Sequence, residues 1–106
     1  MDQTAAERAK RILGVLVDAY QKLQEWNPIP ITKVQPIVVI MLNGEPEATY
    51  AKCRLEIDPS DPGCGLDAYA RRMAKRPEKF CGIGLRSIRD DTPGGHTLII
   101  HQDSFI

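Results

Sequence analysis

The first quarter of the chain carries the clearest pattern of hydrophobic and polar positions. Between residues 4 and 26, apolar side chains recur at steps of three and four, with polar side chains opposite them, and this spacing places them on one face of an α-helix. Thr4 and Glu7 stand at the capping-box spacing and predict where the helix begins. Asn27, followed by two prolines, predicts its end. The expected buried face comprises Ala9, Ile12, Leu13, Leu16, Ala19, Tyr20 and Leu23.

Two stretches in the middle of the chain predict β-strands. After a proline-punctuated connector, residues 37–42 are apolar throughout, which is typical of a central strand covered on both faces. Residues 49–57 alternate between apolar and polar with period two, which predicts a strand with one wet face. Asn43-Gly44 favours a turn between them. Because the polar stretch is longer than two residues, we expect an antiparallel hairpin with a wide loop. Residues 31–34 are a further short-strand candidate.

The second half of the chain predicts the same succession of elements. Residues 58–65 are rich in Pro, Gly and Asp and indicate a loop. A helix is expected over 66–80, and a second hairpin follows it with its turn at Thr92-Pro93-Gly94-Gly95. The order helix-hairpin-helix-hairpin predicts one α+β domain over residues 1–106. We expect a mostly antiparallel sheet of four or five strands with two helices packed on it.

Charge and cysteine content narrow the classes of function. The 14 Lys and Arg residues balance 14 Asp and Glu residues, so no overall field draws the chain to nucleic acid or to an anionic membrane. The three cysteines form no C-x-x-C pair, which favours reduced thiols in a soluble, cytoplasmic protein. The longest apolar run is far shorter than the roughly 20 residues of a bilayer span. We therefore expect no membrane association.

No metal or cofactor site is expected from the sequence. His96 and His101 are the only histidines. Their odd separation directs them to opposite faces of a regular strand, where they cannot share a metal ion.

A basic stripe is the most distinctive feature of the helix predicted over 66–80. At about 100° per residue, its basic side chains fall within an arc of about 140° opposite the apolar ones. The stripe is either the solvated face of an amphipathic helix or a surface that binds an anionic partner. An acidic protein partner is favoured over nucleic acid, because the sequence carries no nucleic-acid-binding motif. The candidate partner-binding residues are Arg71, Arg72, Lys75, Arg76 and Lys79.

The first predicted helix has a wider apolar stripe than one small sheet needs. Leu16, Tyr20 and Trp26 lie on or beside this stripe. Together with the apolar strand 37–42, the stripe suggests a homodimer that uses these three side chains as its interface. The alternative is simple burial in the core of a monomer.

Cys64 is the best candidate for a nucleophile. It lies between two glycines where the second helix is expected to begin, and a helix N-terminus favours the thiolate. The Arg that a thiol phosphatase loop needs six positions later is absent, because that position is Ala70. Most free cysteines are structural.

The sequence favours a small, non-enzymatic interaction module that binds a protein partner and acts as a homodimer. Two other classes stay open. One is a nucleic-acid accessory protein that uses the basic face of helix 66–80, and the other is a small thiol-dependent enzyme with Cys64 as nucleophile.

Overall fold

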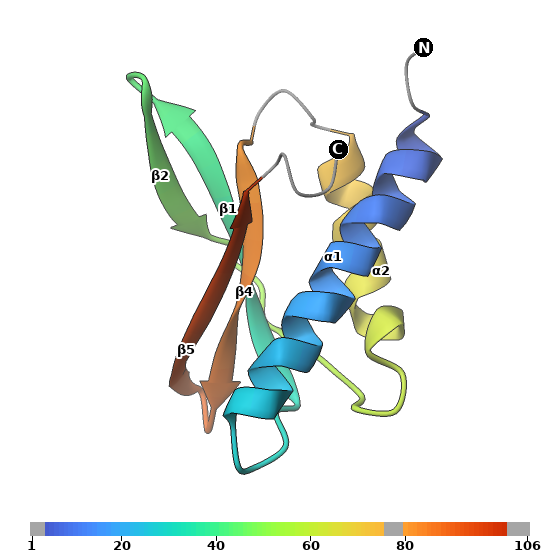
Figure 1. Ribbon diagram of the computed structural model, residues 1–106, viewed down its shortest axis with the longest axis vertical. Helices are drawn as coiled ribbons and strands as arrows, with labels where there is room; N and C mark the ends of the chain where they lie inside the picture. The colour runs from blue at the N-terminus through green and yellow to red at the C-terminus, as the bar shows by residue number, and fades with distance from the viewer. Residues whose placement is uncertain (1–3, 76–79, 102–106) are drawn as a thin grey trace.

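The computed structural model describes residues 4–75 and 80–101. Within these residues the chain forms two helices and a five-stranded sheet, and α1 and α2 lie side by side on one side of that sheet (Figure 1). The elements are α1 (Ala5–Trp26), β1 (Lys33–Leu42), β2 (Glu45–Tyr50), β3 (Leu55–Glu56), α2 (Pro62–Ala74), β4 (Gly82–Arg89) and β5 (Thr92–His101). The predicted α+β class and element order are confirmed.

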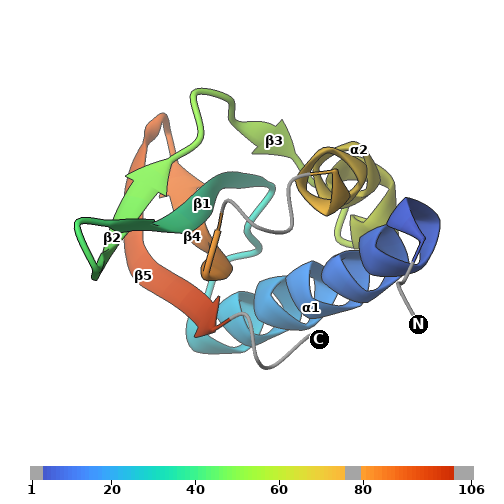
Figure 2. The same cartoon turned by 90° about the horizontal axis from the view of Figure 1, so that it is seen from above.

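The sheet is antiparallel throughout its paired strands. Its order is β2-β1-β4-β5, and β3 pairs with the first residues of β1. β1 lies between β2 and β4, so the predicted central strand is confirmed. The predicted cover on both faces is wrong at its end, because the pairing with β4 stops at Val39, and Met41 and Leu42 are exposed. The sheet curls, as the view from above shows (Figure 2), and only one of its faces is covered by the helices.

The hydrophobic core lies between the helices and the covered face of the sheet. α1 contributes six buried residues, as its periodicity predicts, and Leu13 is half-buried. Thr4 Oγ1 accepts a hydrogen bond of 3.1 Å from the Glu7 backbone N–H and caps the helix. At the other end, Asn27 Nδ2 donates to the Leu23 carbonyl at 2.6 Å. Both predicted ends of this helix are confirmed.

β1 begins earlier than the sequence predicts. It runs from Lys33 through Pro36 without a break, although a proline within a central strand normally removes a ladder hydrogen bond. The Pro36 carbonyl accepts a hydrogen bond of 2.9 Å from Ala51 N, so the backbone of Pro36 faces the β2 side. At that point residues 51–54 leave the sheet. Pro36 therefore costs no bond within the sheet, and the predicted connector is part of the strand.

The strand predicted over residues 49–57 is interrupted, because residues 51–54 leave the sheet. β2 ends at Tyr50, and β3 holds only Leu55 and Glu56. Residues 51–57 still alternate between exposed and less exposed side chains, so the alternation is real although most of these residues lie outside the sheet. Gln35 Nε2 donates to the Ala51 carbonyl at 3.0 Å and replaces the missing ladder partner.

The first hairpin has a tighter turn than predicted. Asn43 and Gly44 form a two-residue turn with φ values of 52° and 82°, which Asn-Gly adopts with little strain. Residues 45–48 pair with β1. The predicted wide loop is therefore wrong, because polar residues can occupy an exposed edge strand.

The turn of the second hairpin also differs from the prediction. It is formed by Asp90 and Asp91, with φ values of 49° and 64°, and not by residues 92–95, which belong to β5. The register shifts between Arg86 and Ile88, and this irregularity accommodates the glycine-rich start of β5.

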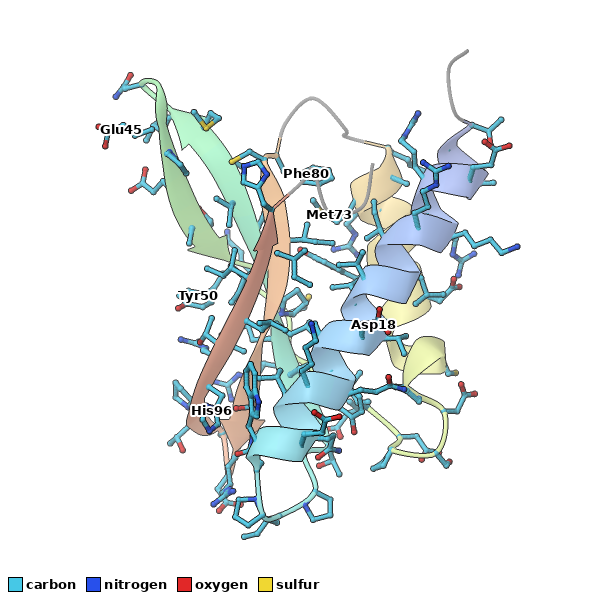
Figure 3. All side chains as sticks on the ribbon, in the orientation of Figure 1. Asp18, Glu45, Tyr50, Met73, Phe80 and His96 are labelled. Carbon is cyan, nitrogen blue, oxygen red and sulfur yellow. The ribbon has the colours of Figure 1, made fainter. Side chains whose placement is uncertain are left out.

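α2 is displaced relative to the predicted helix 66–80. It begins at Pro62, because proline is tolerated in the first turn of a helix, where its missing N–H has no partner to lose. It ends at Ala74, with Lys75 as its C-cap. Residues 76–79 lie outside the described residues, and Phe80 is buried beyond the end of α2. Figure 3 shows Met73 and Phe80 between the sheet and the helices.

Candidate protein-binding surface

The basic stripe of α2 is exposed where the structure describes it. Arg71, Arg72 and Lys75 are all exposed. Arg71 Nη2 lies 2.7 Å from Asp67 Oδ2 one helical turn earlier, so part of the charge is offset. Arg72 and Lys75 form no ion pair with any carboxylate of residues 4–75 and 80–101. Arg76 and Lys79 lie outside the described residues.

A hollow of about 480 Å³ lies beside these residues, between the start of α1 and α2. Arg71, Arg72 and Lys75 contribute its basic side. Its apolar side is made of small side chains, which leave space between the two helices. We call this site the cationic hollow, and its apolar residues are Ala5, Ala6, Ala9 and Ala68.

The two helices are joined beside the cationic hollow. Arg8 Nε of α1 donates a hydrogen bond of 3.1 Å to the Ala74 carbonyl at the end of α2. This bond satisfies one of the last carbonyls of α2, which have no partner within the helix. Arg71 and Arg72 lie in the last turn of α2, where basic side chains also stabilise the negative end of the helix dipole. Arg71 and Arg72 therefore stabilise the end of α2, while Arg72 and Lys75 also present positive charge without a carboxylate partner among the described residues.

The predicted dimer-interface residues occupy two different environments. Leu16 is fully buried and Tyr20 is 2% exposed, both inside a single copy of the chain. Because their side chains fill the core between α1 and the sheet, they are not available to a second copy, and their assignment to an interface is corrected. Trp26 is 48% exposed, and its ring centroid lies 5.7 Å from that of His96 on β5.

Cys64 lies in the first turn of α2, which agrees with its predicted place at the start of the second helix. Its thiol is exposed and free. It forms no hydrogen bond with another described side chain, so the described part of the chain supplies no adjacent base for a thiol nucleophile.

The histidines do not come together. His96 contacts Trp26 from the middle of β5, and His101 is the last residue of that strand. Within the described residues, no group of three His, Cys, Asp or Glu side chains is arranged to hold a metal ion.

A second surface, which the sequence does not reveal, lies on the face of the sheet opposite the helices. The Arg86 guanidinium carbon lies 3.9 Å from the centroid of the Tyr50 ring, and Arg86 Nη2 donates a hydrogen bond to Gln35 Oε1. These three residues come from β4, β2 and β1, so only the strand register brings them together. No sequence spacing could have identified this cluster.

Comparison of the chain with protein-family models, with curated proteins and with solved structures finds no significant match. Neither helix in the described part of the chain is long and apolar enough to cross a membrane.

Proposed function

We propose that this protein is a small non-enzymatic interaction module that binds an acidic segment of a protein partner at the cationic hollow. The observation that carries the proposal is the pairing of two features. Arg72 and Lys75 have no carboxylate partner among the described residues, and they border a hollow whose other side is alanine.

The hollow suits a short segment with both acidic and apolar side chains. A carboxylate of the partner accepts hydrogen bonds from the Arg72 guanidinium or the Lys75 ammonium group. An apolar side chain next to it occupies the space beside the alanines. Exposed ion pairs contribute about 0–1 kcal/mol each, so several such contacts are required and binding weakens as salt is raised.

A nucleic-acid partner is the main alternative for this surface. α2 spans only Pro62–Ala74, and just three basic side chains of the stripe are described. The chain as a whole has no net positive charge. An acidic protein segment needs fewer aligned cations than a phosphate backbone, and this favours the protein partner.

Self-association is part of the same proposal. β5 is an edge strand of ten residues that contains no Asp, Glu, Lys or Arg. The opposite edge strand, β2, carries Glu45, Pro46 and Glu47, which are typical of an edge protected against pairing. Pro93 and the register irregularity protect only the start of β5. The edge of residues 96–101, next to exposed Trp26, has neither, and this supports a homodimer in which two β5 strands pair. Three free cysteines support a cytoplasmic location.

The test of the cationic hollow is a charge reversal with a matched control. In the test variant, Arg72 and Lys75 are both replaced by Glu. In the control, Lys22 and Lys52, two exposed lysines elsewhere on the molecule, are replaced by Glu, so the change in net charge is identical. A labelled peptide that alternates glutamate and leucine, a duplex DNA and a single-stranded RNA are each titrated at several salt concentrations.

The expected result is peptide binding by the wild type and the control, and loss of that binding in the test variant. Equal binding by both variants would show that the hollow is only a solvated helix face. If the wild type binds DNA or RNA near physiological salt and the test variant does not, the nucleic-acid alternative would be supported instead. The association constant for nucleic acid would then fall steeply with salt: its logarithm falls with the logarithm of salt concentration by about 0.9 per neutralised phosphate on duplex DNA.

The thiol-enzyme alternative has its own test. Under the proposal, Cys64 reacts with an alkylating reagent no faster at pH 6 than an ordinary exposed cysteine. Rapid alkylation of Cys64 at that pH, with Cys53 and Cys81 unmodified, would revive the enzyme hypothesis.

A further inference from the structure

The face of the sheet opposite the helices is apolar and only partly covered. Figure 3 shows Tyr50 projecting from this side, away from α1 and α2. Tyr50 is 43% exposed, Ile99 48% and Met41 54%. Exposed apolar side chains that share one surface commonly mark an interaction site. We call this surface the open face, and its residues include Gln35, Met41, Tyr50, Arg86, Thr97 and Ile99.

These residues share the open face because of the strand register. Ile37 pairs with Tyr50 on one side and with Gly84 on the other, and Gly84 in turn pairs with Ile99. Directly paired residues point to the same face of a sheet. Leu98 and Ile100, the neighbours of Ile99, pack on the core, so Ile99 points to the opposite side.

Curling of the sheet keeps the open face compact. A Cβ atom on Gly84 would lie 2.0 Å from the Leu98 carbonyl oxygen and 2.8 Å from Ile99 Cα. The absence of a side chain at Gly84 therefore allows β5 to fold toward the open face. Ile37 is fully buried there without a helix above it.

Arg86 is a cation with an unused donor on this face. Its guanidinium stacks on the Tyr50 ring and donates to Gln35. Arg86 Nε is buried and has no hydrogen-bond partner among the described residues. No carboxylate in the described part of the chain forms an ion pair with Arg86. A partly buried guanidinium without a counter-ion is an unusual feature, since buried charges are normally paired.

The charge pattern of the open face favours an acidic occupant. Alternation directs Glu45 and Glu47 of β2 to the other face, and the remaining long strands carry no Asp or Glu. β3 adds Glu56, which pairs with Lys33 at 3.5 Å. A second copy stacked face to face would bring another Arg86 toward the first, and the carboxylates beside this face, Glu56 and Asp91, already pair with Lys33 and Arg54. The occupant is therefore a different molecule.

We propose that the open face docks a protein segment that presents an Asp or Glu side chain between apolar residues. The carboxylate of that segment accepts charge-assisted hydrogen bonds from the guanidinium of Arg86. Its apolar neighbours pack on Tyr50, Met41 and Ile99. The docking surface is distinct from the cationic hollow, which lies beside α2 on the helix side of the sheet, so this proposal stands or falls separately from the proposed function.

The probe is a short labelled peptide in which one aspartate is flanked by leucines, and a second peptide in which asparagine replaces that aspartate. Each peptide is titrated into the full, isotope-labelled chain, and backbone amide shifts are followed by NMR. The expected shifts lie at Gln35, Tyr50, Thr97 and Ile99. The asparagine peptide is expected to bind about tenfold or more weakly, the loss that follows when a charge-assisted hydrogen bond is removed.

Two isoleucine-to-aspartate variants, one on the open face and one elsewhere, test where the peptide binds. Ile99→Asp places a carboxylate on the open face, where it competes for Arg86 and repels the peptide. Ile29→Asp makes the same change at a residue that is 54% exposed on the connector between α1 and β1. Both replace exposed side chains, so the fold is retained. We expect loss of binding of about tenfold or more in Ile99→Asp and no change in Ile29→Asp. Arg86→Gln should give the same loss as Ile99→Asp.

Several outcomes would overturn the proposal. Shifts confined to α2 would assign the peptide to the cationic hollow, and equal affinity for the aspartate and asparagine peptides would remove the role of Arg86. Shifts of the Gln35 and Tyr50 amides, which lie away from the β5 edge, with protein concentration alone would identify a second copy as the occupant. Binding of an RNA or DNA oligonucleotide on the open face, without binding of the peptide, would replace the protein partner by a nucleic acid.

Discussion

The Tyr20 hydroxyl donates a hydrogen bond of 2.7 Å to the Ile31 carbonyl. Gln24 fixes the same residue, because its Nε2 donates to the Ile31 carbonyl at 3.0 Å and its Oε1 accepts from Ile31 N at 2.9 Å. These bonds fasten the end of α1 to the connector that leads into β1. Tyr69 of α2 is also buried, yet its hydroxyl has no hydrogen-bond partner among the described residues. Burial raises the pKa of both hydroxyls, so both stay neutral at ordinary pH.

Replacement by phenylalanine is expected to change the free energy of unfolding differently at the two tyrosines. Tyr20→Phe removes a bond to a buried carbonyl and should lower the free energy of unfolding by about 1 kcal/mol. Tyr69→Phe removes a buried hydroxyl that forms no hydrogen bond with the described residues, so the free energy of unfolding should stay the same or rise by up to about 1 kcal/mol. Urea denaturation of both variants measures the difference. Equal losses in the two variants would contradict it.

Two glycines should likewise respond oppositely to alanine. Gly14 lies in the middle of α1, where an added Cβ would meet nothing within 4 Å. Gly14→Ala should stabilise the fold by about 0.5–1 kcal/mol, because glycine costs that much within a helix. Gly84→Ala forces a methyl group into the backbone of β5 and should destabilise by about 3 kcal/mol or more. Thermal unfolding of both variants tests the pair, and a Gly84→Ala variant as stable as the wild type would disprove the close approach of β4 and β5.

The turn before α2 predicts a depressed carboxyl pKa. The Ser60 backbone N–H donates to Asp58 Oδ1 at 2.9 Å and the Ser60 hydroxyl donates at 2.8 Å, and these bonds hold the pKa of Asp58 below its usual value of 3.8. A carboxyl with a depressed pKa stabilises the folded state at any pH above its pKa in the unfolded chain. This stabilisation is lost as the pH falls through its pKa in the folded chain. NMR titration of the carboxyl carbon should show the shift. In Ser60→Ala, which keeps only the backbone donor, the pKa should return partway; no change would mean that the hydroxyl contributes nothing.

The proposed homodimer predicts a mass of twice the chain mass in light scattering at micromolar concentration. The Leu98 and Ile100 carbonyls face β4, where they lie against Gly84 and Gly82. By alternation, the backbone of Thr97 faces the free edge of β5. Thr97→Pro should therefore keep the fold and abolish the dimer, because it removes only an outward N–H. Trp26→Ala should weaken the dimer as well. A wild type that stays monomeric at high concentration would refute the homodimer.

Leu98→Pro is the control for the edge variant. Its N–H faces β4, so the substitution should break the sheet itself and lower stability regardless of association. If Thr97→Pro and Leu98→Pro unfold the chain equally, the assignment of the free edge is wrong.

The sequence was most informative where a local pattern decides the structure. The periodicity and caps of α1 predicted its ends, and the unbroken apolar run of residues 37–42 predicted a central strand. The turns are harder to predict. The composition of residues 92–95 favours a turn there, whereas Asp90 and Asp91 adopt the left-handed conformation that makes the turn. The sequence places the start of the strand after Pro36, whereas β1 includes Pro36 because residues 51–54 leave the sheet opposite it, and this depends on pairing between distant residues.

The candidate sites divide in the same way. Local spacing identified the basic stripe of α2, and the structure adds the alanine hollow that only the packing of two helices creates. The wide apolar stripe of α1 was interpreted as surplus surface. Leu16 and Tyr20 are instead covered within one chain, because α1 packs on α2 as well as on the sheet and therefore buries a wider stripe than a helix that packs on a sheet alone. The stacking of Arg86 on Tyr50 depends on strand register, which no single-sequence pattern specifies.

Because residues 51–54 leave the sheet opposite Pro36, one edge of β1 is divided into two stretches that pair with different strands. Residues 37–42 hold β2, whereas Lys33 and Val34 hold β3. The hairpin of β1 and β2 extends away from the helices (Figure 1), and every residue of β2 is exposed. β2 can therefore detach from β1 without breaking the pairing of β3 or β4. We expect amide protons of β2 to exchange with solvent well before those that join β1 to β4, so that the chain opens as a small flap long before it unfolds.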